Sequence, residues 1–429
     1  MKTVVIEHLA RVEGHGGITV ELEGDTVGSV RFDVFEGARL LEPLVRGKRY
    51  DEVAAILSRI CSICSVAHSL TSLKATENAF EVRVSPQTEL LRELLYRGES
   101  IESHALHLFL LALPDYLDYP SATALAADRP AAVLLGLRLK KLGNSIQEAI
   151  GGRAIHPVNA VPGGFGRAPA VEQLIELRNG LIEGVADAKA AIDLMASLPA
   201  ADFCHSDTIY AALRANVDSY YAGDEVAVVS DGGQTIVPAA DYRTLTNERS
   251  VPHSHARHSR FQGKPFMVGS LARLSVNPGR LSGSLAAPAA RLDFRLPAGN
   301  PMDNNKAQAL ELAGDVERAL EIIEQLLRAR IRDEPPAPVH PRAATGTAIT
   351  EAPRGLLIHS YTYDGEGRIL SADVITPTAL NAASLEAHLR QTVEQCAERD
   401  DAVIAKRLQM IARAYDPCIS CSVHLVRRR

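Results

Sequence analysis

Two short stretches at opposite ends of the chain carry the same pattern. Residues 58–68 read SRICSICSVAH, and residues 416–424 read DPCISCSVH. Each holds a Cys-x-x-Cys pair followed by a histidine, and Cys64 and Cys418 are 354 positions apart. A structural zinc site usually closes a local loop, with about 15 to 20 residues between its two pairs. Pairs this far apart are instead expected to meet in a buried catalytic centre that joins both ends of the fold.

The composition is that of an ordinary globular protein. The chain has 429 residues, 46% of them hydrophobic and 23% charged. Its net charge of −6, without a long basic block, argues against a nucleic-acid partner. It has no run of about 18 apolar residues and no apolar export signal near its start, so we expect no membrane span and a cytoplasmic location. Export while attached to a partner remains an alternative.

The hydrophobic pattern predicts an α+β fold, with a central bundle of long helices and small peripheral β-sheets and hairpins. Apolar residues recur at spacings of three and four in five segments, which are 86–113, 130–150, 170–197, 303–331 and 380–414. Alternating residues around Gly24-Asp25 predict an N-terminal hairpin over 17–36, and a second hairpin is predicted to turn at residues 364–367. Residues 202–300 are predicted to form short strands and loops.

We expect one large catalytic subunit in which these elements follow each other without an internal repeat. Its parts, in order, are the N-terminal hairpin region (1–60), the helical bundle (61–200), the mixed insertion (201–300) and the C-terminal helices, hairpin and Cys-x-x-Cys pair (301–429).

Four thiolates in two pairs suit zinc, an iron–sulfur cluster, or nickel with iron. A long-range zinc site, with four cysteines or with three and His68, is one alternative. A thioredoxin-like redox pair is less favoured, because no βαβ pattern surrounds either motif. The two remaining cysteines, Cys204 and Cys396, are predicted to be small buried hydrophobic residues. Spacing alone therefore leaves the metal open.

The residues around the pairs resemble the [NiFe]-hydrogenase large subunit. That family reads Arg-x-Cys-Gly-x-Cys-x-x-x-His near its N-terminus and Asp-Pro-Cys-x-x-Cys-x-x-His near its C-terminus, and this chain departs at Ser62, where the family has glycine. Further segments resemble the family in the same order, and they are RVEGH (11–15), GRAIHPVN (152–159), PGGF (162–165), APRG (352–355) and PTALN (377–381). The resemblance spans almost the whole chain and implies the [NiFe]-hydrogenase large-subunit fold.

The resemblance implies reversible heterolytic cleavage of H2 at a nickel–iron centre whose iron carries carbon monoxide and cyanide. Cys61 and Cys418 would bind nickel terminally, while Cys64 and Cys421 would bridge nickel and iron. Electrons would pass to a small iron–sulfur subunit, then through flavin- and NAD(P)-binding and additional iron–sulfur subunits to NAD(P). A maturation protease and a nickel chaperone are further implied partners.

The chain length and the form of both motifs look most like the cytoplasmic NAD(P)-linked, sulfhydrogenase-type alpha subunit. A deazaflavin- or heterodisulfide-linked group is the nearest competitor. The alternatives from other classes are a zinc-stabilised structural subunit and a catalytically silent, hydrogenase-like subunit.

Several residues around the centre take roles by the same resemblance. Arg354 would lie over the open coordination position and donate to a cyanide, and Asp416 would orient it. Pro417 is expected to hold Asp416 in an extended conformation. Glu13 would carry protons away from the terminal Cys418.

By the same resemblance, His68 would hydrogen-bond a bridging sulfur without being a ligand. It lies four residues after Cys64, so on a helix the two residues share a face. Pro377 and Thr378 would line the pocket of the diatomic ligands, with Thr378 as a donor.

A second metal, magnesium or iron, is implied near the C-terminus. Its ligands would be Glu42, His424 and a backbone carbonyl around Val374. Residues 425–429 (LVRRR) resemble a C-terminal peptide that is cut off after nickel insertion. A separate histidine cluster, formed by His253, His255 and His258, could bind a metal, but its segment also resembles a structural stretch of the family.

Overall fold

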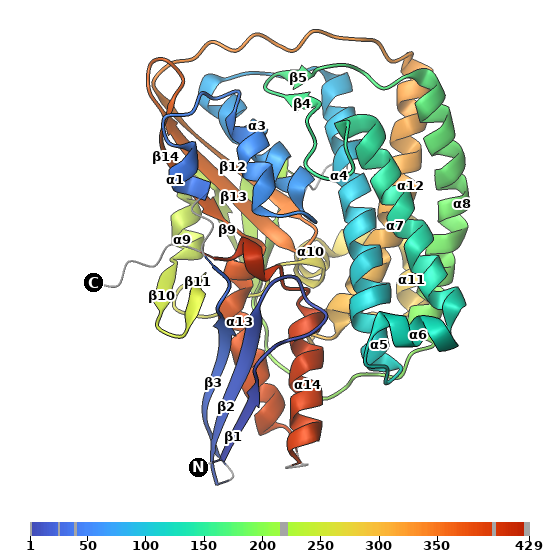
Figure 1. Ribbon diagram of the computed structural model, residues 1–429, viewed down its shortest axis with the longest axis vertical. Helices are drawn as coiled ribbons and strands as arrows, with labels where there is room; N and C mark the ends of the chain where they lie inside the picture. The colour runs from blue at the N-terminus through green and yellow to red at the C-terminus, as the bar shows by residue number, and fades with distance from the viewer. Residues whose placement is uncertain (1, 25, 38–40, 215–221, 397–399, 424–429) are drawn as a thin grey trace.

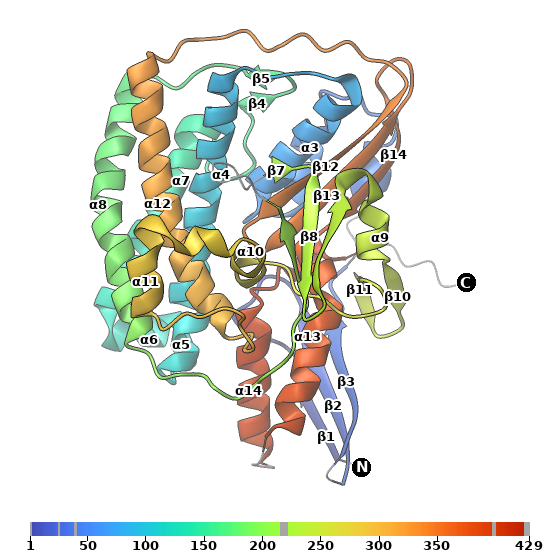
Figure 2. The same ribbon diagram turned by 180° about the vertical axis from the view of Figure 1, so that it is seen from behind.

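The computed structural model describes residues 2–24, 26–37, 41–214, 222–396 and 400–423. One half of the molecule is a bundle of long helices, and the other half contains small sheets with helices packed on them (Figures 1 and 2). The last part of the described chain lies between the two halves, where Figure 1 colours it red. Among the described residues, no helix is both long and apolar enough to cross a membrane. The predicted α+β fold with a helical bundle is confirmed.

Four long helices form the bundle, and they are α4 (Pro86–Leu106), α7 (Pro130–Gly151), α8 (Val171–Ala196) and α12 (Asp303–Ala329). Helix α4 begins where the Ser85 hydroxyl accepts a hydrogen bond from the backbone N–H of Thr88, and α7 ends at Gly152 in the left-handed conformation. The predicted helices in these four segments are confirmed. After α4 the chain continues through a π-helical turn, His107–Ala112, into α5 (Leu113–Tyr116).

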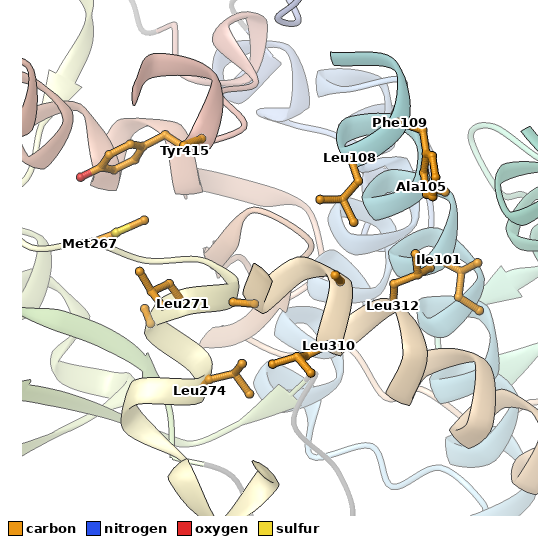
Figure 3. Packing of buried hydrophobic residues seen from close by; sticks show 14 of the residues in the cluster. Ile101, Ala105, Leu108, Phe109, Met267, Leu271, Leu274, Leu310, Leu312 and Tyr415 are labelled. Atoms are coloured by element: carbon orange, nitrogen blue, oxygen red, sulfur yellow. The ribbon is translucent and has the colours of Figure 1, made fainter. Parts of the chain in front are cut away.

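Helices α4 and α7 approach each other closely at two glycines. A Cβ atom on Gly143 would lie 2.4 Å from the carbonyl oxygen of Gly98, so a larger residue would push the two helices apart. Figure 3 shows apolar side chains elsewhere in the same core, among them Ile101 of α4 and Leu310 and Leu312 of α12. Full burial of each such side chain contributes about 1.5 to 3 kcal/mol.

The N-terminal sheet is antiparallel and has the order β1 (Lys2–Ile6), β2 (Gly16–Glu23) and β3 (Thr26–Val34). The predicted hairpin at 17–36 is confirmed by β2 and β3, which pair from Gly16 with Val34 to Glu23 with Thr26. Strand β1, which was not predicted, adds to the outer edge of β2. The sheet packs on two C-terminal helices, α13 (Pro377–Glu394) and α14 (Asp401–Ala414), which confirms the helical segment predicted at 380–414.

The central sheet carries helix α3 (Ser65–Phe80) on one face. Its strand order is β14 (Ile369–Ile375), β13 (Gly355–Tyr363), β12 (Ala344–Ala352) and β7 (Ala222–Gly223). The predicted hairpin at 364–367 joins β13 to β14 and is confirmed. Strand β12 was missed because it follows directly on the proline-rich stretch 334–342. Helix α3 lies so close to β12 that a Cβ on Gly346 would lie 2.1 Å from the Ala75 carbonyl oxygen.

Residues 201–300 form the predicted short strands and loops, together with short helices that were not predicted. Two small sheets contain β6 (Tyr210–Leu213), β8 (Glu225–Ser230) and β9 (Gly233–Pro238), and β10 (Arg249–Val251) with β11 (Ser254–His258). The helices of this part are α9 (Tyr242–Thr246), α10 (Ser270–Val276) and α11 (Ala286–Arg291). Further short helices and strands among the described residues are α1 (Leu41–Val45), α2 (Val53–Leu57), α6 (Ala122–Asp128), β4 (Ala160–Val161) and β5 (Gly164–Phe165).

Candidate metal centre

The two Cys-x-x-Cys pairs meet in the interior. Cys61 Sγ lies 3.3 Å from Cys418 Sγ, and Cys64 Sγ lies 3.8 Å from Cys421 Sγ. The four sulfur atoms lie within 4.8 Å of one another, and none of the four cysteines forms a disulfide. Each residue is at most 5% exposed. The expectation that both ends of the chain build one buried centre is therefore confirmed.

Local structure presents the first pair at the start of a helix. Cys61 follows the 3-10 turn Ser58–Ile60, and Cys64 is the N-cap residue of α3. The backbone N–H of Cys64 donates to Cys61 Sγ over 3.1 Å. A helix N-terminus carries partial positive charge, so it stabilises a thiolate at this position.

The electrostatics of the cluster favour a bound metal. Burial raises the pKa of the Cys418 thiol well above its usual value and that of Cys421 to about 11. Against the same burial, hydrogen bonds among the thiols and the charge of Arg354 lower the pKa of Cys61. Four buried thiolates would carry more negative charge than one arginine can balance, and uncompensated buried charge is costly. Metal cations supply that balance, and four soft sulfur donors fit nickel and iron.

Arg354 lies in the two-residue turn between β12 and β13 and is buried next to the second pair. Its Nη2 donates to the Asp416 carboxylate over 2.9 Å, and its Nε donates to the Asp416 carbonyl oxygen over 2.7 Å. Its Nη1 donates to Ser103 Oγ over 3.3 Å. Although burial alone would lower it, the Asp416 carboxylate and the nearby thiols raise the pKa of Arg354. The guanidinium is therefore charged and held at three points.

Asp416 does not have the expected extended conformation. Its φ is +49°, in the left-handed region that aspartate tolerates better than most residues. The restriction that Pro417 imposes is overridden here by tertiary contacts, because both the carbonyl and the carboxylate of Asp416 accept from Arg354. Gln308 Nε2 donates to the second carboxylate oxygen over 3.1 Å.

Glu13 contacts the second pair directly. Its Oε2 lies 3.1 Å from Cys418 Sγ, which donates to it, and it also accepts from the backbone N–H of Ser420 over 3.1 Å. The Ser420 hydroxyl donates to the other carboxylate oxygen. The next residue must be a glycine, because Gly14 has φ +88° and a Cβ there would lie 2.8 Å from Ile419.

Helix α13 begins beside Cys418. Pro377 is its first residue, and the Thr378 hydroxyl oxygen accepts the backbone N–H of Cys418 over 2.9 Å. Both residues are buried. That leaves the hydroxyl hydrogen of Thr378 available as the predicted donor.

His68 lies one turn into α3, and its Nδ1 is 3.1 Å from His359 Nε2. Its Nε2 is buried and has no hydrogen-bond partner among the described residues. An unsatisfied buried nitrogen of this kind fits a contact to a sulfur of the bound centre, and that role stays a prediction.

The ligands expected for a second metal are only partly placed. Glu42 lies in α1, and its carboxylate accepts the backbone N–H of Val374 over 2.8 Å. The two predicted residues are therefore neighbours. His424 and residues 425–429 lie outside the described residues.

The separate histidines form a hub around Glu386 of α13. His253 Nε2 lies 2.7 Å from one carboxylate oxygen, which also accepts the backbone N–H of Phe32, and His258 Nδ1 lies 3.6 Å from the other. These three side chains come within 4.8 Å of one another, whereas His255 contacts the Glu36 carbonyl. The Glu386 carboxylate is already bound by these groups, so we interpret the cluster as a structural contact that joins β3, β11 and α13.

Sequence reasoning missed three supporting residues. Glu99 of α4 is fully buried and accepts the backbone N–H groups of Val66 and Ala67, over 2.6 and 2.9 Å, at the start of α3. Gln308 and His359 support Asp416 and His68. His359 could have been found, because LLIHSYTY places polar rings at alternate positions of one buried strand face. No local pattern marks Glu99 or Gln308.

Comparisons with known proteins agree with this geometry. The family described as nickel-dependent hydrogenase matches residues 39–150 and 211–424, and a HoxL-like family matches residues 3–36. The alpha subunits of sulfhydrogenases 1 and 2 of Pyrococcus furiosus are 39% and 36% identical to this chain. Each alignment covers 99% of this chain, with 98% of the first relative and 99% of the second.

A solved structure gives the same picture. The crystal structure of an NAD+-reducing [NiFe]-hydrogenase in the H2-reduced state superposes with a TM-score of 0.86 at 26% identity, covering 99% of this chain and 100% of that one. The family match, the relatives and the four converging cysteines point to one conclusion. The chain belongs to the nickel-dependent hydrogenase family: it is the large, catalytic subunit of a [NiFe] hydrogenase, and its four cysteines form the site of the nickel–iron centre.

Proposed function

We propose that this subunit catalyses the reaction H2 + NAD(P)+ → NAD(P)H + H+ together with partner subunits, in either direction. Cys61 and Cys418 would hold nickel terminally, and Cys64 and Cys421 would bridge it to iron. When bound, the centre supplies the Lewis acidity and redox capacity for heterolytic H2 cleavage. The remaining steps fall to side chains of this chain.

Proton transfer is the task of Cys418 and Glu13. The observation that carries the proposal is the 3.1 Å contact between Cys418 Sγ and Glu13 Oε2. A proton on this sulfur can pass to the carboxylate without a rearrangement, because donor and acceptor are already within hydrogen-bond reach. Glu13 is partly exposed, so it can release that proton toward solvent.

Positioning and charge are the tasks of Arg354 and its neighbours. The three contacts of its guanidinium fix a positive charge beside the cysteines, where Asp416 keeps it from moving. Arg354 would donate to a cyanide of the iron. Pro377 and Thr378 would line the pocket of the diatomic ligands, and His68 would donate to a bridging sulfur.

Electrons would leave through a small iron–sulfur subunit. Cys204 and Cys396, the only cysteines outside the centre, are both buried. Two cysteines are too few to hold a cluster with the usual four cysteine ligands. A flavin- and NAD(P)-binding subunit and further iron–sulfur subunits would complete the path. The sulfhydrogenase relatives and the NAD+-reducing structure support this acceptor, and its use implies a cytoplasmic enzyme.

A second metal, magnesium or iron, would be held by Glu42, the Val374 carbonyl and His424. The contact between Glu42 and Val374 supports it. A maturation protease and a nickel chaperone would act on the C-terminal end, with residues 425–429 as the peptide that the protease removes.

The test measures nickel, iron and zinc together in the subunit, purified anaerobically with its partners. We expect about one nickel per chain and H2-dependent reduction of NAD+ or NADP+. Zinc at one per chain without nickel, from a host with nickel and maturation proteins, would overturn the catalytic assignment. Nickel with H2-dependent reduction of a dye but of neither nicotinamide would overturn only the acceptor.

A further inference from the structure

Four buried polar side chains form a hydrogen-bonded chain behind the first cysteine pair. His68 Nδ1 lies 3.1 Å from His359 Nε2, and His359 Nδ1 lies 2.5 Å from the hydroxyl of Tyr361. That hydroxyl lies 3.1 Å from Ser72 Oγ. None of the four residues has exposed surface. This series of hydrogen bonds therefore has no exit to solvent, and it cannot carry protons out of the protein.

The fold places these groups together. His359 and Tyr361 are two positions apart on β13 and share one face of the strand, while His68 and Ser72 are four positions apart on α3 and share one face of the helix. Helix α3 packs against this sheet face. His68 also lies one turn after Cys64, whose carbonyl accepts its backbone N–H over 3.1 Å.

Both histidines are neutral near pH 7. Burial lowers the pKa of His68 to about 4 and lowers that of His359 well below its usual value. A neutral imidazole has one N–H donor and one acceptor nitrogen. The direction of each hydrogen bond in the chain therefore fixes the direction of the next.

Two arrangements give every internal contact one donor and one acceptor, and this structure has the first, because the Tyr361 hydroxyl donates to Ser72 Oγ. In the first, Tyr361 donates to Ser72, His359 Nδ1 donates to Tyr361, and His68 Nδ1 donates to His359, so His68 Nε2 has a lone pair. In the second, all directions are reversed, and His68 Nε2 carries the proton. The single open end is His68 Nε2, which is buried without a partner among the described residues.

We propose that His359 and Tyr361 are positioning residues that set which nitrogen of His68 carries its proton, in step with the charge of the cysteine cluster. Protonated thiols can donate to the lone pair that His68 Nε2 has in the first arrangement. Metal-bound thiolates can only accept, so they favour the N–H that His68 Nε2 has in the second. This inference rests on the proposed function only in requiring that the four cysteines bind metal as thiolates.

The test is nitrogen-15 NMR of the full-length chain with labelled histidines, reduced and metal-free, and again after loading with Zn2+. Zinc is a diamagnetic probe that binds four thiolates. The ring signals are assigned with His68→Gln and His359→Gln. We expect zinc to move the proton from Nδ1 to Nε2 on both histidines.

Tyr361→Phe should remove this response. Without the Tyr361 hydroxyl, an N–H on His359 Nδ1 has no acceptor, whereas an N–H on His68 Nε2 can use a thiol sulfur as a weak acceptor, so His359 should carry its proton on Nε2 even without zinc. Ser72→Ala should do the same, because Tyr361 can then donate only to His359, and it serves if Tyr361→Phe does not fold. Tyr363→Phe is the matched control, since the Tyr363 hydroxyl lies 2.8 Å from Thr76 on the same sheet face and outside the chain.

Unchanged tautomers in the zinc-loaded wild type, or a response of Tyr361→Phe equal to that of Tyr363→Phe, would overturn the inference. A chain that takes up no zinc would overturn it as well, because the selecting thiolates would not form. The first two results do not bear on nickel uptake or H2 turnover, so the inference and the proposed function can fail or hold separately.

Discussion

The two cysteine pairs have nearly the same sequence but are held in place by different means. Cys61 and Cys64 sit at the start of a 16-residue helix whose first N–H groups are bound by Glu99. Cys418 and Cys421 lie on a single 3-10 turn, fixed by contacts of Cys418 with Thr378 and Glu13. Secondary structure positions the first pair, and long-range side-chain contacts position the second. Substitution of the residues that contact Cys418 should therefore reduce H2 oxidation more than it reduces metal binding.

Removing a sulfur ligand should erase the difference between the pairs. Cys418→Ala and Cys64→Ala should each lose bound nickel and all H2 oxidation, because either change leaves three donors and an open cavity. Nickel content by elemental analysis and H2 oxidation by dye reduction are the measurements. Cys204→Ala, outside the centre, is the control and should keep both. A nickel-replete Cys418→Ala variant would contradict the assigned centre.

Glu13→Gln should separate chemistry from metal binding at the second pair. The amide keeps the size of the side chain but accepts protons poorly, so H2 oxidation should fall by about 10²- to 10⁴-fold with nickel retained. The same change at the partly exposed Glu21 of β2 is the control. Parallel loss of nickel and activity in Glu13→Gln would show that Glu13 only supports the fold.

Arg354→Lys should have a smaller effect of the same kind. Lysine keeps the charge but cannot reproduce the three contacts to Asp416 and Ser103. We expect kcat to fall by about 10²-fold, the usual effect of losing one oriented donor, with nickel content unchanged. An unchanged kcat in the Arg354→Lys variant would mean that the positive charge alone is sufficient.

The packing of α13 against the end of α14 should weaken in acid. His388 Nδ1 lies 2.6 Å from the Tyr415 hydroxyl, and burial lowers the pKa of this histidine from about 6.5 to about 4. The pKa of His388 is lower in the folded than in the unfolded protein. Its contribution to the free energy of unfolding is therefore fully present above about pH 6.5 and is lost as the pH falls toward 4, by up to about 3 kcal/mol. His388→Gln should flatten this part of the stability curve, as measured by denaturant unfolding from pH 7 to 4. An equally steep curve in the variant would assign the loss to other groups.

The smallest effect on the chemistry is expected where α4 and α7 approach each other. Gly143→Ala should push α4 and α7 apart and cost about 1 to 3 kcal/mol of stability, with kcat per nickel unchanged. Gly365→Ala, at a turn with open space around it, is the matched control. A large fall in kcat for Gly143→Ala would mean that the bundle spacing reaches the centre.

The long helices and the metal ligands could be predicted from sequence because each leaves a local signal. Apolar spacing gave α4, α7, α8 and α12 to within a few residues, and the motifs gave Cys61 and Cys418. Strand β12 was missed because a proline-rich stretch directly precedes it, although its partner β13 follows after only two residues.

The supporting residues of the centre were hidden because their contacts are far away in sequence. Glu99 acts on a helix 32 residues away in sequence, and Gln308 contacts Asp416 across 108 residues. The conformation of Asp416 was predicted wrongly because the rule for residues before proline is a local preference. Here the carbonyl and carboxylate contacts with Arg354 outweigh it.

The meeting of Cys61 with Cys418 has a consequence for how the protein is made. These residues are 357 positions apart, and a ribosome adds about 5 to 20 residues each second. The first pair therefore waits roughly 20 to 70 seconds as free thiols before its partner has been synthesised. During this interval the thiols of the incomplete centre can be oxidised or can bind the wrong metal. The order of synthesis thus makes nickel insertion a late event, and it makes protection of the waiting thiols a requirement of the cell.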